Sequence, residues 1–410
     1  MTPLLLLASR PEPVVWRYFD EVRAISRHEG ELFADTSGGR LVRRNGSWQV
    51  ASDRSFGAAG TRAPEALVAP PSGSVGTHLT ATTPDGRVRS FWGDTHLWRQ
   101  EGQAWRRWIT RPPAPGDYAL FAEDERLLAG TPNGLFAFAG GKWRREALPH
   151  GLPLARPHGL ARVLSKWVVG GLQGLWIGRP GAWKGVDTTP VRQVLGDGKA
   201  VWVLFGNGAL DKLEPALDRR HPDVLHGAAK RPWGSCLALG AGGLLIGGDG
   251  GWIEKRGDAL VERYPKELKG QVVTALAAAG SRRFVGTQKG GLFVFDGPKV
   301  WVANPGSGLR DPWVTALLFR GNGVNVATAT AGLFRLRNGR VEQMAGPTMR
   351  PRHLANQGRS LVVGGMDGAW RQERGGWEAL VRAEEVTALT TDATVTASGV
   401  YFSRGPIAPR

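Results

Sequence analysis

Arginine recurs close to proline in five short segments of this chain. The segments are TRPPAPGD, LARPHGL, AKRPWGS, GLRDPWV and TMRPRHL, and their arginines are Arg111, Arg156, Arg231, Arg310, Arg350 and Arg352. A guanidinium group binds a carboxylate or a phosphate through parallel hydrogen bonds, so these residues suit the binding of anions. Because proline is common in loops and arginine is abundant here, coincidence is the alternative explanation.

The whole chain is strongly basic. Its 53 Lys and Arg residues outnumber 36 Asp and Glu residues, which gives a formal net charge of +17. Such an excess favours anionic partners, among them nucleic acid, acidic polysaccharide, lipid headgroups and acidic proteins. A solubility device or a compositional bias explains the charge equally well, because charge governs association and not chemistry.

Metal ligands do not occur in a recognisable pattern. The sequence has no HExxH motif and no Cys–His pair with zinc spacing, so we expect no metal and no cofactor. His150 and His158 flank GLPLARP, and one alternative brings them together with His353 from another part of the fold. We favour the simpler interpretation that such loop histidines are solvated. The eight histidines are His28, His78, His96, His150, His158, His221, His226 and His353.

Catalytic groups are also sparse. Cys236 is the single cysteine, which excludes an intramolecular disulfide, and its apolar neighbours indicate a small buried residue instead of a nucleophile. The glycine-rich segment 240–251 is followed by WIEKRGD, which reads as another strand, whereas a phosphate loop requires a helix there. The sialidase-type Ser-x-Asp-x-Gly-x-x-Trp box is absent as well. We therefore expect no enzyme, with a lyase or hydrolase as the alternative.

The elements that must position these residues come from an internal repeat. Residues 273–297, VTALAAAGSRRFVGTQKGGLFVFDG, align with residues 314–339, VTALLFRGNGVNVATATAGLFRLRNG, and weaker copies lie on both sides. A period near 40 residues with four strands per unit is typical of a β-propeller. The ten units have first strands that begin near Val22, His78, Ala119, Leu160, Val191, Ser235, Val273, Val314, Arg352 and Val386.

Each repeat also predicts its own turns and packing. The glycine pair before Leu292 permits a positive φ at the turn between the second and third strands, and the following Asp-Gly predicts a hairpin. Tryptophans follow these hairpins at similar offsets, which favours packing between blades over a surface for stacked bases. They are Trp48, Trp105, Trp143, Trp183 and Trp377.

The ends of the chain predict how the propeller closes. The last unit supplies three strands, and residues 13–19, PVVWRYF, have the character of the missing outer strand. This pairing leaves no open sheet edge. We therefore expect an all-β chain in which residues 1–410 form one domain, a single propeller of ten blades with an insertion at residues 53–75. Two smaller propellers are the alternative.

In a propeller, the connections that lead into the first strands lie on one face around the channel mouth. The arginines beside proline would then form a partial cationic ring there. The first strands themselves contain no pair of acids. The arginines and histidines that they offer are Arg23, His78, Arg162, Arg192, Arg352 and His353.

Residues 273–297 resemble the propeller repeat of two-component regulators, with its Val-x-Ala-Leu strand, Phe-Val-Gly-Thr strand, Gly-Gly-Leu-Phe strand and Asp-Gly turn. The match is good there, fair for residues 314–339 and 127–143, and loose elsewhere. The resemblance implies a sensory propeller, which in that family is usually fused to a membrane helix and a kinase. It implies a fold and not a site.

The sequence as a whole favours a non-enzymatic scaffold or sensor that binds another protein. Binding of an anionic polymer through the arginine face is the alternative. No segment approaches the roughly 20 apolar residues that span a bilayer. The N-terminal MTPLLLLASRPEP lacks the basic segment of a secretory signal, so we expect a cytoplasmic location ahead of a periplasmic or secreted one.

Overall fold

The structure is a computed structural model. It describes residues 15–51, 75–83, 86–92, 94–113, 119–123, 126–154, 156–163, 166–214, 220–226, 228, 234–240, 242–347, 350–357, 359–391, 393–397 and 399–402. The described residues form ten four-stranded antiparallel sheets and two short 3-10 turns, η1 (Lys266–Leu268) and η2 (Pro305–Ser307). The prediction of an all-β chain built from four-stranded repeats is confirmed. Of the predicted insertion, residues 53–74 lie outside the described residues.

Contacts divide the chain into two compact units. We call residues 17–153 the N-terminal unit, and residues 154–410 together with residues 1–16 the C-terminal unit. The N-terminal unit contains the sheets β2 (Val22–His28), β3 (Glu31–Thr36), β4 (Gly39–Arg44), β5 (Ser47–Val50); β6 (Val75–Thr83), β7 (Gly86–Trp92), β8 (His96–Glu101), β9 (Ala104–Thr110); and β10 (Ala119–Glu123), β11 (Arg126–Thr131), β12 (Gly134–Ala139), β13 (Lys142–Arg145).

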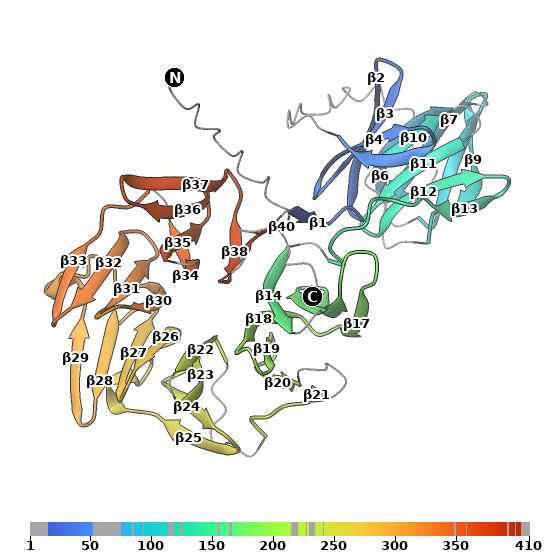
Figure 1. The fold of residues 1–410 in the computed structure, drawn as a ribbon. Helices are drawn as coiled ribbons and strands as arrows, with labels where there is room; N and C mark the ends of the chain where they lie inside the picture. The colour runs from blue at the N-terminus through green and yellow to red at the C-terminus, as the bar shows by residue number, and fades with distance from the viewer. Residues whose placement is uncertain are drawn as a thin grey trace, which may run out of the picture. The chain divides into compact units, whose positions relative to one another are not determined.

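The C-terminal unit contains the other sheets, whose strands run from green to red in Figure 1 except for the blue β1. They are β14 (Pro157–Val163), β15 (Lys166–Gly171), β16 (Gly174–Gly178), β17 (Lys184–Asp187); β18 (Val191–Gly196), β19 (Val201–Phe205), β20 (Leu210–Leu213), β21 (Arg220–His221); β22 (Cys236–Gly240), β23 (Gly243–Gly248), β24 (Gly251–Arg256), β25 (Ala259–Arg263); β26 (Val273–Ala279), β27 (Arg282–Thr287), β28 (Leu292–Asp296), β29 (Lys299–Ala303); β30 (Val314–Arg320), β31 (Gly323–Thr328), β32 (Gly332–Arg337), β33 (Arg340–Gln343); β34 (Pro351–Gln357), β35 (Ser360–Gly365), β36 (Gly368–Glu373), β37 (Gly376–Arg382); and β38 (Val386–Leu389), β39 (Ala393–Thr396), β40 (Gly399–Phe402) with β1 (Val15–Arg17) beside β40.

One sheet shows why these residues form these strands. In β27, Phe284 and Val285 are both buried although their side chains point to opposite faces, because sheets pack against β27 on both sides. Gly291 has a φ of +90° at the turn into β28, and Gly297 has a φ of +58° in the hairpin into β29. Both turns therefore use glycine where a side chain would be strained, as the sequence predicts.

The sheets of the C-terminal unit follow one another through their inner strands. The neighbouring inner strands β14, β18, β22, β26, β30, β34 and β38 contact each other in that order, and β38 contacts β14. Figure 1 shows this order, with red β38 beside green β14. The strand β1 lies next to β40, which agrees with the expectation that an N-terminal strand completes the last sheet.

The sheets of the N-terminal unit do not follow chain order. The indole of Trp143 donates to the carbonyl of Thr110 (2.7 Å), and the indole of Trp48 donates to Glu146 (3.4 Å). Val22, the first residue of β2, packs at Gly130 of β11. The sheet β10–β13 therefore lies between β6–β9 and β2–β5. In these contacts, as in the bond from Trp377 to the carbonyl of Ala345 (3.0 Å), the predicted packing of tryptophan between sheets is confirmed.

The prediction of a single ring is not shown by these contacts. The number of four-stranded sheets equals the ten predicted units, but three belong to one compact unit and seven to the other. The boundary at residues 153 and 154 lies inside GLPLARP. That segment has the same proline-rich composition as the connections between other sheets, so nothing in the sequence distinguishes it as a domain boundary.

Candidate functional site

Six of the seven inner strands of the C-terminal unit, all except β22, have a bulge near their first residue. In β26, for example, Val273 pairs with Thr287 and Ala275 pairs with Gly286, so that Thr274 is left over. A bulge re-aims the side chain of its extra residue. The equivalent residues, with Ser235 just before β22, are His158, Arg192, Ser235, Thr274, Thr315, Arg352 and Thr387.

These side chains join each inner strand to the next one. The hydroxyl of Thr315 donates to the carbonyl of Pro351, the first residue of β34, at 2.7 Å. A histidine ring bonded to a carbonyl must be the donor, and His158 bonds to Val191 in this way. The further bonds of this kind are Arg192 to Gly234 (3.1 Å), Ser235 to Val273, Thr274 to Val314 and Thr387 to Pro157. In β34 the bond to the next strand, at Val386, comes from His353.

The bonds place the beginnings of all seven inner strands side by side. We call the face on which these strands begin the start face of the C-terminal unit. The connections that precede the strands, and the turns between second and third strands, lie on this face because first and second strands are antiparallel.

Two of the predicted arginines meet on one carboxylate of the start face. Arg156 Nη2 donates to Glu385 Oε2 at 2.6 Å, and Arg352 Nη1 donates to Glu385 Oε1 at 3.1 Å. The side chains of Arg156 and Arg352 are 57% and 49% exposed, whereas that of Glu385 is 24% exposed. Three consecutive inner strands, β34, β38 and β14, therefore supply one arginine–glutamate–arginine group.

Two histidines adjoin this group. Burial lowers the pKa of His353 to about 4, the positive charge of Arg352 and the interaction with His158 lower it further, and the bond to Val386 opposes them in part. His353 is therefore neutral at pH 7. The alternative that brings His158 near His353 is supported by this interaction, while His150 belongs to the N-terminal unit. The preferred prediction of solvated loop histidines is wrong for His353, because this residue stands inside β34.

The other predicted arginines are dispersed. Arg310 and Arg350 are exposed in the connections that lead into β30 and β34, so they lie on the start face. Arg111 belongs to the N-terminal unit, where its backbone N–H donates to the carbonyl of Thr95 (2.9 Å). Arg231 lies outside the described residues. The full cationic ring and the binding of an anionic polymer therefore stay predictions.

Large apolar side chains are exposed at the same face. Trp313 and Val272, which directly precede β30 and β26, are 44% and 36% exposed. Leu172, in the turn after β15, is 60% exposed. Phe319 and Leu239 are also exposed, but they lie towards the opposite ends of their strands β30 and β22. Trp313 was missed at the level of sequence, although its place just before Val-Thr-Ala-Leu was a usable signal.

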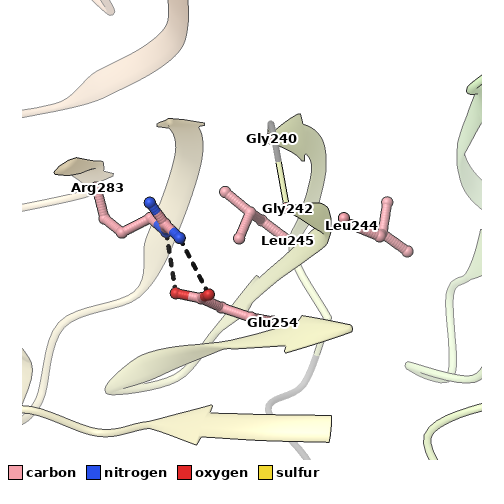
Figure 2. Close-up of a pocket in the computed structure, with 7 residues that line it drawn as sticks. Gly240, Gly242, Leu244, Leu245, Glu254 and Arg283 are labelled. Atoms are coloured by element: carbon pink, nitrogen blue, oxygen red, sulfur yellow. Dashed lines mark hydrogen bonds and ion pairs between the residues drawn. The ribbon is translucent and has the colours of Figure 1, made fainter. Parts of the chain in front are cut away.

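The best-defined buried ion pair is structural. Arg283 on β27 donates to both oxygens of Glu254 on β24, at 2.9 and 3.1 Å, as Figure 2 shows. Burial raises the pKa of Glu254, but hydrogen bonds from Arg283, Trp252 and Arg256 outweigh it and bring the pKa to about 2. The space beside this pair does not hold a water molecule. The pair therefore links two sheets and leaves no room for a ligand.

Neither a reactive thiol nor a metal-binding cluster is found among the residues that the structure describes. Burial raises the pKa of the Cys236 thiol to about 12, which confirms the prediction of a small buried residue. Among the residues that the structure describes, no three His, Cys, Asp or Glu side chains gather as a metal site. In the same part of the chain, no helix is long and apolar enough to cross a membrane.

The fold is similar to that of solved β-propeller proteins. The extracellular domain of the hybrid two-component system BT3049 from B. thetaiotaomicron matches with a TM-score of 0.53 and 13% identity, over 93% of this chain and 56% of that one. The extracellular domain of the one-component system BT4673 matches with a TM-score of 0.49 and 14% identity, over 98% and 59%. The WD40 propeller domain of Doa1 matches with a TM-score of 0.48 and 11% identity, over 60% and 92%.

These similarities concern the fold alone. This chain spans little more than half the length of the two extracellular domains that it matches. No protein family and no curated protein sequence matches the chain. The comparisons support an all-β repeat protein of the propeller type and identify no partner.

Proposed function

We propose that the chain is a non-enzymatic interaction module that binds an acidic partner protein through the start face of its C-terminal unit. The observation that carries the proposal is Trp313, which is 44% exposed on the same face as Arg310 and Arg350. Tryptophan and arginine are the residues most enriched among those that dominate the energy of protein interfaces.

The scaffold in this proposal is a propeller of seven blades. The contact between β38 and β14 supports it, because a single ring of ten would insert three further blades between these strands. The bond from Thr387 to the carbonyl of Pro157 repeats, at this junction, the link found between other neighbouring inner strands. The seven-bladed ring replaces the expected ten-bladed one, and the N-terminal unit is a second domain of three sheets.

Trp313 is presented by a rigid loop. The buried carboxylate of Asp311 accepts hydrogen bonds from the backbone N–H of Trp313 (2.9 Å) and from the N–H and hydroxyl of Thr330 (2.6 and 2.7 Å). These bonds tie the connection before β30 to the turn after β31. A side chain that is held in place before binding loses less conformational entropy when a partner covers it.

The charge of the chain indicates the chemistry of the partner. With a net charge of +17, the chain attracts acidic surfaces. Arg310 and Arg350 are exposed within the connections of the start face that lead into β30 and β34. Complementary charge raises the rate of association and excludes basic partners. An acidic protein with an apolar patch for Trp313 therefore fits this face best.

The test compares two aromatic residues at opposite ends of one strand. Wild type, Trp313→Ala and Phe319→Ala serve as baits for proteins of the native organism, and the affinity of each recovered partner is then measured with purified components. Phe319 is 39% exposed, nearly as much as Trp313, so it is a matched control. Trp313→Ala is expected to weaken binding by about thirtyfold or more, because a central tryptophan contributes about 2 kcal/mol or more.

The binding should also weaken as salt concentration rises. Equal retention of the same partners by all three baits would contradict the proposal. Loss with Phe319→Ala alone would place the interface on the opposite face.

A further inference from the structure

The polar side chains around the start face are distributed unevenly. The side chains that link three neighbouring strands, β22, β26 and β30, to the next inner strand are the small neutral Ser235, Thr274 and Thr315. In contrast, the strands β34, β38, β14 and β18 follow one another and carry charged or imidazole groups in their first three residues or directly before them. We call the latter the closure arc, and its residues are Arg156, His158, Arg192, Arg352, His353 and Glu385.

The guanidinium groups of the closure arc have donors to spare. Arg156 and Arg352 each reach a different oxygen of Glu385, so neither grips the carboxylate with two parallel bonds. About half of each arginine side chain is exposed. Since a guanidinium carries several N–H groups in one plane, most of those on Arg156 and Arg352 are left for a second acceptor.

Glu385 does not cancel the charge of its two partners. One carboxylate between two guanidinium groups leaves one positive charge in excess, and Arg192 from β18 adds another cation to the same arc. Glu385 also holds Arg156 and Arg352 close together against their mutual repulsion. The pair is therefore preorganised for an anion that bridges both guanidinium groups.

The two histidines complete the surroundings with ring nitrogens that accept. His158 donates from Nδ1 to the carbonyl of Val191, so its Nε2 carries a lone pair when the ring is neutral. His353 likewise donates to the carbonyl of Val386. Both imidazole rings are held in place by their hydrogen bonds to the next inner strand. Each imidazole can accept a hydrogen bond from a hydroxyl group of a ligand.

We propose that the closure arc binds one small oxyanion, a carboxylate or phosphate group of a low-molecular-weight ligand, which bridges Arg156 and Arg352. The ligand's acidic group takes the guanidinium donors that Glu385 leaves, and its hydroxyl groups bond to His158 and His353. The site is separate from the Trp313 surface and does not depend on a partner protein.

The test measures binding of inorganic phosphate and of succinate to the full chain by titration calorimetry at low ionic strength. Wild type is compared with the double variant Arg156→Ala/Arg352→Ala and with Arg310→Ala/Arg350→Ala. Both double variants lose two exposed arginines of the start face, so they have the same net charge. We expect saturable binding to wild type, at least a tenfold loss in the first variant and less than a twofold change in the second.

Two further variants make the test independent of folding. Arg352→Lys keeps the positive charge but loses the planar donors, and it should weaken binding at least several-fold. Trp313→Ala changes a residue outside the closure arc and should leave binding unchanged.

The comparison of the two probes identifies the ligand class. Tighter binding of phosphate indicates a phosphate ester, and tighter binding of succinate indicates a carboxylic acid. Equal losses in the two double variants would show a general effect of surface charge and overturn the proposal. The absence of saturable binding of both probes to wild type would overturn it as well.

Discussion

At the scale of single residues, burial decides what an ion pair contributes to stability. Glu254 and Arg283 have side chains only 6% and 11% exposed, and they join two neighbouring sheets. Asp296 and Arg282 form a pair at 2.8 Å within a single sheet, but their side chains are 42% and 60% exposed. The first pair is screened little by water and the second strongly.

Replacement of Glu254 by Gln should therefore lower the free energy of unfolding by about 3–5 kcal/mol, because Arg283 keeps its charge in a buried place. Asp296→Asn, the matched surface change, should lower it by less than about 1 kcal/mol. Denaturant unfolding of both variants measures the difference. Similar losses in the two variants would show that burial does not set the strength of these pairs.

His353 makes the stability of the folded chain depend on pH. Its pKa in the folded chain is about 4, compared with an ordinary value of 6.5, so the unfolded chain takes up a proton that the folded chain refuses. The stability that the neutral ring provides is complete above pH 6.5 and is lost as pH falls towards 4.

Thermal unfolding of His353→Gln should therefore vary less with pH across this window than that of wild type. The amide of Gln still donates to Val386 but does not titrate. The control is His221→Gln. The native His221 side chain is 49% exposed and pairs with Glu214. An unchanged pH profile in His353→Gln would contradict the burial of the ring.

Individual residues of the site were only partly predictable from sequence. Arg156 and Arg352 stand out because they lie beside proline, and the structure brings them together. Glu385 is equally important to the group but resembles any acid before a strand. Its role depends on the approach of β38 to β14. These two strands are far apart in the sequence and meet through the fold, as the bond from Thr387 to the carbonyl of Pro157, 230 residues away, shows.

At the scale of elements, a glycine in the second strand of one sheet accommodates the first residue of the next inner strand. A Cβ added to Gly286 would lie 2.4 Å from Val314 Cγ1, and one added to Gly364 would lie 2.5 Å from Val386 Cγ1. The roles are reversed between β19 and Gly234, which precedes the inner strand β22. Here the large residue, Leu204, is on the second strand, and the glycine is at the start of the next sheet. At each such contact, one strand supplies a large side chain and the other supplies a glycine, and either strand can take either role.

Gly286→Ala should consequently lower the free energy of unfolding by about 1–3 kcal/mol through overpacking. Val314→Ala in the same chain should recover part of this loss, since it removes Cγ1 of Val314, the atom that clashes with the added Cβ. The control is Gly375→Ala, where an added Cβ meets no atom within 4 Å, and it should change stability by less than about 0.5 kcal/mol. Additive effects of Gly286→Ala and Val314→Ala would contradict the contact.

Elements were the most predictable part of this chain. The expected first strands at Val22, Ala119, Val191, Val273, Val314 and Val386 begin at those residues, and the remaining four begin within three residues of the expected position. Local features such as Val-Thr-Ala-Leu and Asp-Gly determine each strand and turn. The same features recur in every repeat, so they carry no information about which sheet becomes the neighbour of which.

At the scale of the whole molecule, the two units differ in how their sheets are connected. In the C-terminal unit the last inner strand contacts the first, while in the N-terminal unit β2 packs against β10 and β11 and not in chain order. Each unit has its own glycine–valine contact, at Gly286 with Val314 and at Gly130 with Val22. Because each core is separate, we expect the two units to unfold independently.

Scanning calorimetry of the full chain should therefore show two transitions. Gly286→Ala should lower the midpoint of one transition and Gly130→Ala the midpoint of the other, because an added Cβ at Gly130 would lie 2.7 Å from the carbonyl oxygen of Val22. Cleavage near residue 153 should leave both midpoints in place, with β1 still paired to β40. A single transition that both substitutions shift would instead indicate one cooperative ring, because only a continuous core would transmit both defects to every sheet.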